Sequence, residues 1–226
     1  MTQPLIEHEF RGKKLSFTDT PQAPDLIREI FSDNYKVLEA GIEFKDGDVV
    51  LDIGACEGMF STMMSVLFPH IRIIALEPVP RTYGFLVDNL TRNGCKNVEA
   101  YNIGVGKTGA KTGIINMGLH NHSGGSSSWL TFDPTKTEKV EVGLISLDDA
   151  FELYGIDRCR FLKIDIEGAE YDALYSCTVL PRVDYMAGEF HMNQRLTFET
   201  RRMDALATWC HNQTKLIYIE CCNMAE

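Results

Sequence analysis

The stretch from Asp48 to Gly58 constrains the fold of this chain more than any other. Val49–Ile53 is a short, mainly apolar run of the kind found in parallel strands that are covered on both faces. Gly54 and Gly58 bracket the residues that follow, and the next apolar side chains recur at helical spacing. The stretch therefore predicts a buried strand, a glycine turn where backbone approaches a ligand closely, and the start of a helix.

The spacing of the two glycines indicates which ligand the turn accepts. A dinucleotide fold uses G-x-G-x-x-G to seat a pyrophosphate at a helix N-terminus. This turn instead reads G-x-x-x-G, with Asp52 two residues before it. Glu57 would place a negative charge beside a diphosphate, which is repulsive. The turn therefore favours a nucleoside with a positive amino group and no phosphate, such as S-adenosylmethionine.

A second strand is predicted over residues 71–76, and it ends at Glu77 and Pro78. Glu77 follows Gly58 by 19 positions (77 − 58). An acid about 20 residues on, at the tip of the second strand, is placed to accept both ribose hydroxyls of a nucleoside. The alternative is a solvated carboxylate before a proline turn. The two signals, in this order and at this spacing, favour a nucleoside site.

The remaining strands of the predicted sheet are recognised by their apolar runs. They are residues 98–103, 161–165, 183–190 and 215–220. Gly104 and Val105 follow the third of the six strands, so we expect them to form a backbone and apolar wall near an adenine. Strand order should reverse beside the first strand, which is where open α/β sheets bind ligands.

The segment between the third and fourth strands is long for a crossover connection. Residues 112–117 and 139–145 predict a β-hairpin insertion around a loop, 118–129, that is rich in His, Ser and Gly. Long loops are commonly functional, so we expect this one to contribute to the adenine and acceptor surface. A solvated hairpin tip is an equal alternative. The pair His120 and His122 is weak evidence for a metal site.

Three motifs in this chain resemble the FkbM family of S-adenosylmethionine-dependent methyltransferases. They are LDIGACEG at 51–58, LEPVP at 76–80 and KIDIEGAE at 163–170. The resemblance covers roughly residues 35–191, and family members commonly have Asn where this chain has Cys56. It implies an α/β fold of the class I methyltransferase, Rossmann-like type, with a doubly wound, mainly parallel sheet. It also implies methyl transfer, usually to a hydroxyl of a sugar, polyketide or similar natural product.

The motifs and the predicted topology together give a set of residues expected to bind the cofactor. They are Asp52, Gly54, Ala55, Cys56, Glu57, Gly58, Glu77, Pro78, Gly104, Val105 and Asp165. Residues 1–34 are expected to form an N-terminal arm with a helix, opened by Asp25, that lids the cofactor site, and 35–226 the methyltransferase domain. Tyr35 either lies over the ligand or is a packed surface tyrosine.

Methyl transfer to an alcohol needs a base or a Lewis acid near the acceptor oxygen. By topology, Asp165, Glu189 and His191 converge at the ends of adjacent strands, and we expect them to be catalytic. His191 is the predicted base at neutral pH, and Asp165 would hold the methionyl amino group, orient the acceptor, or both. A structural histidine is the alternative for His191. Glu167 and Glu170 are expected in the first turn of the next helix, stabilised by its dipole.

A metal-assisted mechanism is the less favoured alternative to the histidine base. A hard divalent ion such as magnesium, bridging Asp165 and Glu189 to acceptor oxygens, would lower the pKa of the alcohol. We therefore expect S-adenosylmethionine as the cofactor and leave a metal open.

Composition and charge limit the partners and the compartment. The net charge of −10 argues against nucleic acid, because its binding is driven by Lys and Arg. Seven cysteines with no C-x-x-C pair favour free thiols in a reducing, cytoplasmic compartment. We expect no signal peptide and no membrane partner, since no apolar run approaches membrane length.

Two other functions and the assembly of the chain stay open. A nicotinamide-dependent oxidoreductase shares the strand–turn–helix plan, but the second glycine of its motif and an evident Tyr/Lys relay are missing. A non-catalytic protein that binds S-adenosylmethionine is disfavoured by the joint presence of Asp165, Glu189 and His191. The expected partner is a small hydroxylated acceptor. A dimer is compatible with the sequence, because the sheet edge is completed by the insertion, the N-terminal arm or a second subunit, or is left incomplete.

Overall fold

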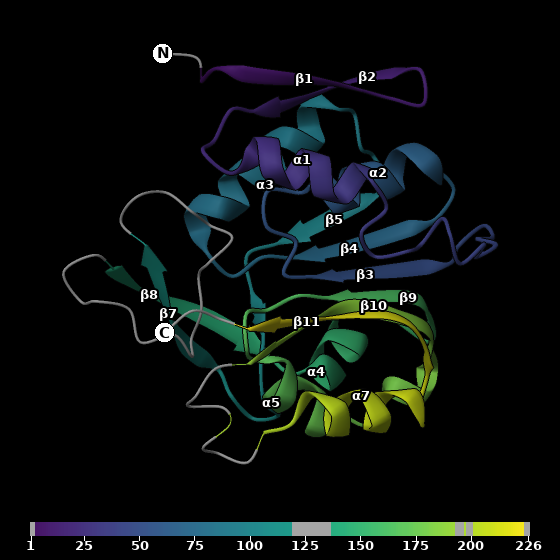
Figure 1. Cartoon of the computed structure of the whole chain (residues 1–226), viewed down its shortest axis with the longest axis vertical. Helices are drawn as coiled ribbons and strands as arrows, with labels where there is room; N and C mark the ends of the chain where they lie inside the picture. The colour runs from purple at the N-terminus through teal and green to yellow at the C-terminus, as the bar shows by residue number, and fades with distance from the viewer. Residues whose placement is uncertain (1–2, 119–136, 193–196, 198–200, 224–226) are drawn as a thin grey trace.

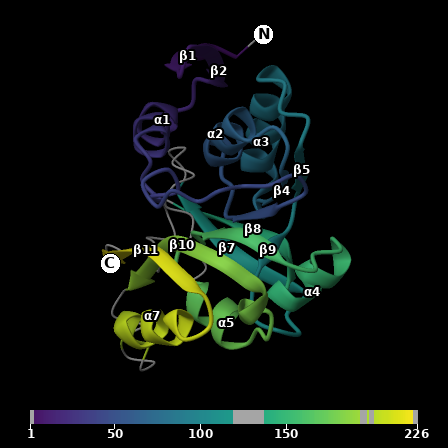
Figure 2. The same ribbon diagram turned by 90° about the vertical axis from the view of Figure 1, so that its right-hand side faces the viewer.

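The computed structural model describes residues 3–118, 137–192, 197 and 201–223. Its centre is a six-stranded parallel sheet between two layers of helices (Figures 1 and 2). In sheet order the strands are β11 (Lys215–Asn223), β10 (Val183–Met192), β9 (Cys159–Ile164), β3 (Val49–Ile53), β4 (Arg72–Leu76) and β5 (Val98–Tyr101).

Helices cover both faces of this sheet (Figures 1 and 2). One face carries α1 (Ala23–Phe31), α2 (Met59–Leu67) and α3 (Pro80–Arg92). The other carries α4 (Leu147–Leu153), α5 (Glu170–Tyr175) and α7 (Met203–His211). A short 3-10 helix, Leu180–Arg182, leads into β10. Within the described residues no helix is both long and apolar enough to cross a membrane.

The strand order confirms the predicted fold class. From β3 the chain moves outward to β4 and β5, and it then returns to place β9 on the other side of β3. In order of appearance in this sheet the strands therefore run 3-2-1-4-5-6, the order of doubly wound dinucleotide-binding folds. The switch point lies between β3 and β9, as the sequence predicted, and ligands bind at such points beyond the carboxyl ends of the strands.

The apolar run of β3 explains why it lies at the centre. All of its residues are buried. Val49, Leu51 and Ile53 belong to the hydrophobic cluster that contains residues of α4, α5 and α7. Val50 points to the opposite face and packs in the cluster formed with α1 and α2. A strand covered on both faces is continuously apolar rather than alternating, and β3 follows this rule except at Asp52.

The N-terminal segment holds a β-hairpin in addition to the helix that the sequence predicted. β1 (Leu5–Phe10) and β2 (Lys13–Thr18) form an antiparallel hairpin of their own. Phe17 of β2 is fully buried in the same cluster as residues of α1 and α2. The side-chain oxygen of Asn89 in α3 accepts a hydrogen bond from the backbone N–H of Thr18 (2.9 Å). The division at residue 34 stays a prediction, but the hairpin and α2 share one core.

The predicted hairpin insertion is present. β7 (Thr112–Gly118) and β8 (Thr137–Ile145) pair antiparallel, and β6 (Gly104–Val105) adds to β8 to give a separate three-stranded sheet. Figure 1 shows this sheet beyond the carboxyl ends of the central strands. The rest of the His/Ser/Gly loop, with His120 and His122, lies outside the described residues.

The edge of the central sheet is the strand β11. It pairs with β10, and neither β1–β2 nor β6–β8–β7 extends it in the described part of the chain. Two of the sequence-based proposals for completing the edge, the insertion and the N-terminal arm, are therefore not seen there.

Two glycines give a test of the packing that holds the sheet together. A Cβ added to Gly188 of β10 would lie 2.1 Å from the backbone oxygen of Ile164 in β9. Gly188→Ala should therefore lower the free energy of unfolding by about 1–3 kcal/mol or more. Gly84 lies in the interior of α3 with nothing within 4 Å of an added Cβ, so Gly84→Ala should raise it by up to about 1 kcal/mol. Urea denaturation measures both; equal effects would contradict the strand packing.

Candidate active site

A cavity of about 410 Å³ lies at the switch point of the sheet. Its lining comes from the residues that follow β3, β4 and β9, from β10, from α1, and from the β6–β8–β7 sheet. The size is typical of a pocket for a small molecule. The chain thus places its cavity where a doubly wound sheet is expected to bind a ligand.

Most of the predicted site residues line this cavity. They are Gly54, Ala55, Cys56, Glu57, Glu77, Pro78, Gly104, Val105, Asp165 and Glu189. Asp52, Gly58 and His191 are not among the lining residues. Gly58 instead begins α2 with a positive φ of 83°. The role of each residue as a cofactor ligand or catalyst stays a prediction.

The glycine turn after β3 is pressed against the end of β9. Gly54 has a positive φ of 74°, and an added Cβ would lie 1.8 Å from the backbone oxygen of Asp165. Its N–H donates to the backbone oxygen of Leu76 at the end of β4 (3.0 Å). Only glycine fits a left-handed position at such close range, and the turn therefore exposes backbone rather than side chains to the cavity.

Glu77 connects this turn to the end of β4, the second strand of the predicted nucleoside site. Its side chain is almost fully buried, and it accepts hydrogen bonds from the backbone N–H of Cys56 (3.0 Å) and of Val79 (2.9 Å). Burial raises the pKa of Glu77 to about 7, although both hydrogen bonds favour the ionised form. The carboxylate is thus held rigidly at the cavity wall.

Glu57 lines the cavity but also fastens the N-terminal segment to the turn. Its carboxylate accepts hydrogen bonds from Thr20 Oγ1 (2.8 Å) and Gln22 Nε2 (2.6 Å). The side chain of Asn89 in α3 donates to the backbone oxygen of Glu57 (2.8 Å). The segment that leads into α1 is therefore bonded directly to the predicted cofactor turn.

Lys163 is a site residue that the sequence analysis missed. Its Nζ donates to the backbone oxygen of Gly54 (2.6 Å) and lies 3.4 Å from Asp52 Oδ1 and 3.9 Å from Asp165 Oδ2. Asp52 is fully buried, and its other oxygen accepts from Ser61 Oγ (2.7 Å). Asp52 therefore supports the cavity through Lys163. The signals in the sequence are a lysine among the apolar residues Phe161, Leu162 and Ile164 and its place at the start of the third motif, 163–170.

Burial by itself would lower the pKa of Lys163 by disfavouring the charged ammonium. The charges of Asp52 and Asp165 outweigh burial and raise that pKa. Lys163 is therefore a permanently charged group between the glycine turn and Asp165.

Tyr35 lies in the cavity wall and is almost fully buried. Its hydroxyl donates to Asp165 Oδ2 (3.0 Å) and lies within hydrogen-bond distance of Glu189 Oε1 (3.3 Å). Its ring packs edge-on against Phe60 of α2, with centroids 5.6 Å apart. Tyr35 is therefore packed in the interior and not at the surface, and the prediction that it lies over the ligand stays a prediction. The pKa of Tyr35 is raised by burial and by the neighbouring carboxylates.

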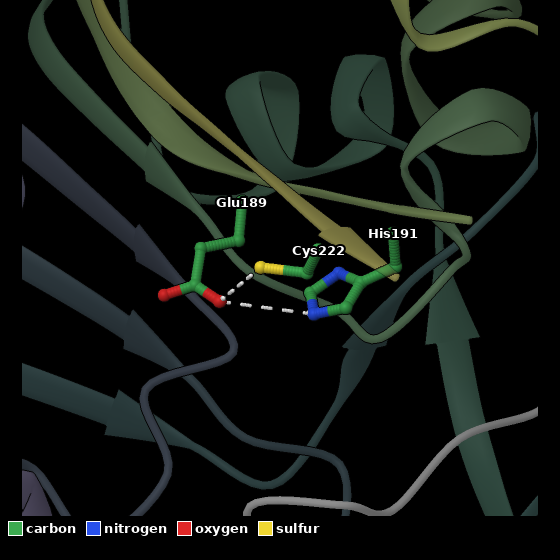
Figure 3. Close-up of side chains that lie close together, drawn as sticks. All are labelled: Glu189, His191 and Cys222. Atoms are coloured by element: carbon green, nitrogen blue, oxygen red, sulfur yellow. Dashed lines mark hydrogen bonds and ion pairs between the residues drawn. The ribbon is translucent and has the colours of Figure 1, made fainter. Parts of the chain in front are cut away.

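Glu189 and His191 project from the end of β10 toward the same side, as alternate residues of a strand do (Figure 3). Glu189 Oε2 accepts a hydrogen bond from the thiol of Cys222 (3.3 Å), which is paired in register with His191. Burial and the charge of Asp165 raise the pKa of Glu189.

Glu170 positions the ring of His191, although the sequence analysis gave Glu170 only a structural role in the first turn of a helix. Its Nδ1 lies 3.0 Å from Glu170 Oε1, and Glu170 is fully buried. Glu170 also accepts hydrogen bonds from the backbone N–H of Ile166 (3.1 Å) and of Gly168 (3.0 Å). These contacts fix the ring so that Nε2 is directed away from Glu170.

Three carboxylates surround Nε2 of His191. The nearest oxygens of Glu167, Glu189 and Asp165 lie 3.5, 3.8 and 4.0 Å from it. Burial by itself would lower the pKa of His191, but the hydrogen bond and the charge of Glu170, together with the other carboxylates, raise it to about 10. An imidazolium cannot accept a proton, so these surroundings do not favour His191 as a base at neutral pH, and its catalytic role stays a prediction.

The position of Glu167 also differs from the prediction. α5 begins at Glu170, so Glu167 precedes the helix instead of occupying its first turn. Its backbone is left-handed, with φ of 54°. Burial and the neighbouring Asp165 raise its pKa.

Replacing Lys163 tests whether its charge holds the turn, the first strand and the acidic cluster together. Lys163→Met should lower the free energy of unfolding by about 3–5 kcal/mol, because Asp52 is left as an uncompensated buried charge. Adding Asp52→Asn should recover part of this loss. Lys107→Met removes an exposed lysine of the cavity and should change stability by less than about 0.5 kcal/mol. Chemical denaturation of the variants measures each effect; no recovery in the double variant would contradict the ion pair.

The fold and the cavity define a doubly wound α/β protein with a cavity at the switch point of its sheet, lined on one side by the carboxylates of Asp165, Glu167 and Glu189. The chain belongs to the FkbM methyltransferase family, because residues 52–225 match the family described as "Methyltransferase FkbM domain". This match confirms the resemblance of the three sequence motifs and speaks against the nicotinamide-dependent alternative.

Curated relatives are similar to this chain over most of its length. "Methyltransferase 1" of Beauveria bassiana is 28% identical over 166 residues, which cover 65% of this chain and 64% of the relative. The "31-O-demethyl-FK506 methyltransferase FkbM" of Streptomyces tacrolimicus is 27% identical over 209 residues, covering 80% of this chain and 79% of the relative. The chain thus spans slightly less than two thirds of the fungal relative.

Among solved structures, the precorrin-6y C5,15-methyltransferase of Geobacter metallireducens is 18% identical, with a TM-score of 0.39. The match covers 68% of this chain and 57% of that one. At this score it carries no argument about fold or function, which rest on the strand order and the family match.

Proposed function

We propose that this chain transfers a methyl group from S-adenosylmethionine to a hydroxyl of a small acceptor. The observation that carries the proposal is the position of Glu77, whose carboxylate is fixed beside the glycine turn in the same cavity as Asp165 and Glu189. One half of the cavity thus offers a ribose acceptor and exposed backbone. The other half offers carboxylates for an acceptor molecule.

The cofactor half is assigned as follows. Glu77 accepts the ribose hydroxyls, and the turn from Gly54 to Cys56 lies against the methionyl portion. Gly104 and Val105 supply the backbone and apolar wall for the adenine. In support, these residues come from the ends of β3 and β4 and from β6, and all of them line the cavity.

The acceptor half supplies the proton chemistry. Because the neighbouring carboxylates raise the pKa of His191 to about 10, we assign the proton-accepting role to Glu189 and an orienting role to Asp165. The acceptor hydroxyl gives its proton to a Glu189 oxygen as its own oxygen attacks the methyl carbon. The carbon–sulfur bond breaks with its electron pair remaining on sulfur, which yields S-adenosylhomocysteine. Alignment of the reactants is the protein's main contribution.

An oxygen acceptor is favoured by one relative. The Streptomyces tacrolimicus protein is named as a methyltransferase of 31-O-demethyl-FK506, which points to methylation of an oxygen in that molecule. The identity of the acceptor of this chain is not fixed by that name, since the two sequences are 27% identical.

Methyl transfer is tested with S-adenosylmethionine labelled at the methyl group and a panel of hydroxylated small molecules. We expect label in an ether product, and Glu189→Gln should slow the reaction by about 10²–10⁴-fold while leaving affinity for S-adenosylhomocysteine within about twofold. Glu220→Gln, a change of the β11 residue paired in register with Glu189, is the matched control and should keep the rate. Label found only in amine products, or no binding of S-adenosylhomocysteine, would contradict the proposal.

The role of Glu77 predicts how cofactor affinity changes with pH. The pKa of the unliganded carboxyl is about 7, and ribose hydroxyls that donate to it favour the ionised form and lower its pKa in the complex. Affinity for S-adenosylhomocysteine should therefore be highest above pH 7 and fall about tenfold between pH 8 and pH 6. Calorimetric titration measures it. Glu77→Gln should remove this dependence, and an unchanged slope would assign it to another group.

A further inference from the structure

We propose that Asp165, Glu167 and His191 form a binding site for a divalent cation such as Mn²⁺, facing the acceptor half of the cavity. Asp165 and Glu167 line the cavity, and His191 lies directly behind them. The proposal deepens the proposed function, because the ion would lie where an acceptor oxygen must be activated.

The first support is the arrangement of the donor atoms. One side-chain donor atom from each of these residues lies within 4.8 Å of the other two. The His191 Nε2 is 3.5 Å from Glu167 Oε2 and 4.0 Å from Asp165 Oδ1. Six-coordinate ions with bonds of about 2.1 Å separate neighbouring donors by about 3 Å and opposite donors by about 4 Å. The observed spacing needs only small side-chain shifts to close on an ion.

The second support is the direction of the histidine. Its side chain is only 5% exposed, and its Nε2 is aimed into the space between the carboxylates. In the described part of the chain the contacts of Nε2 are these carboxylate oxygens at 3.5–4.0 Å, which are longer than a hydrogen bond to imidazole. The ring is thus buried with one nitrogen directed at a set of anionic oxygens and not closely bonded to any of them.

The nitrogen on the other side of the ring has the partner expected of a metal ligand. Nδ1 lies 3.0 Å from Glu170, a fully buried carboxylate that two backbone N–H groups hold in place. Metal-binding histidines commonly donate their second N–H to a carboxylate, which fixes the tautomer and leaves the free nitrogen for the ion. We therefore assign Glu170 as a positioning residue of the site.

The crowding of carboxylates in this region also favours a cation. Lys163 lies 3.4 Å from Asp52 and 3.9 Å from Asp165. Oxygens of Asp165, Glu167, Glu170 and Glu189 all lie within 4.0 Å of a ring nitrogen of His191. Carboxylates this close to one another repel when ionised, and a divalent ion between them would offset that repulsion.

Cys222 is close to His191 but is not assigned as a ligand, and this affects which ion the site would bind. Its thiol donates a hydrogen bond to Glu189 Oε2, so it carries a proton and is not an available thiolate (Figure 3). The donor set is then two carboxylates and one imidazole, which suits Mn²⁺ better than a thiophilic ion. Glu189 remains at the edge of the site, free to take the acceptor's proton.

The test is a titration of the full-length chain with Mn²⁺ after treatment with a chelator, followed by calorimetry and by the electron paramagnetic resonance signal of free Mn²⁺. We expect one ion per chain. Glu167→Gln removes a ligand that lies on a turn and should weaken binding at least about tenfold, and Glu170→Gln should weaken it by a similar factor through His191.

Asp172→Asn is the matched control, because Asp172 lines the same cavity but pairs with Arg201 (2.6 Å) outside the cluster. It should leave Mn²⁺ affinity within about twofold. Retained binding of S-adenosylhomocysteine and an unchanged melting temperature establish that each variant is folded. Failure of the wild-type chain to bind Mn²⁺, or equal binding by wild type and Glu167→Gln, would overturn the proposal.

A second measurement separates this proposal from the proposed function. Chelation should reduce methyl transfer while leaving affinity for S-adenosylhomocysteine unchanged, and added Mn²⁺ should restore the rate. Full transfer after chelation by a chain that binds no Mn²⁺ would overturn the cation site and leave the proposed function intact. Site-specific Mn²⁺ binding without transfer to any oxygen acceptor would support the cation site and contradict the proposed function.

Discussion

The buried ammonium of Lys163 is the contact on which the site depends. It joins the backbone of Gly54 and the carboxylates of Asp52 and Asp165, which belong to two neighbouring strands and the turns that follow them. A lysine in this position is stable only because the carboxylates offset the cost of burying its charge. The same three contacts set the distance between the cofactor turn and the acceptor half of the cavity. Geometry at the switch point is thus maintained by contacts of Lys163 in the cavity wall, which hold predicted ligand-binding residues in place.

The carboxylates around the site also affect the role that can be assigned to His191, near the end of β10. A histidine near neutral pH ordinarily suggests a base. His191, however, has one nitrogen bonded to Glu170 and the other directed at carboxylates. As an imidazolium it has no lone pair to offer, and as a ligand of a cation its lone pair is already used. In both states His191 organises negative charge, which is why the proposed function assigns the acceptor's proton to Glu189 and not to His191.

The fold and the cavity lining beside the glycine turn were predictable because their signals are local. The apolar run of β3, the glycines that follow it and an acid at the tip of β4 are each visible within a few residues, and Glu77 lies at the cavity wall. The acceptor half was less predictable. Lys163, Tyr35 and Glu170 acquire their roles from partners far away in the sequence, such as the 130 positions between Tyr35 and Asp165. No periodicity or spacing rule records such a contact.

The N-terminal segment contacts both halves of the cavity. Near its middle, Thr20 and Gln22 bond to Glu57 of the cofactor turn, and at its end Tyr35 bonds to Asp165. Between these points α1 packs on α2 with buried apolar residues. We expect a segment bonded at both ends beside the cavity to restrict which acceptors enter it. Differences in acceptor choice among proteins with the same glycine turn are therefore expected to arise in this segment and in the β6–β8–β7 sheet, while the central strands stay the same.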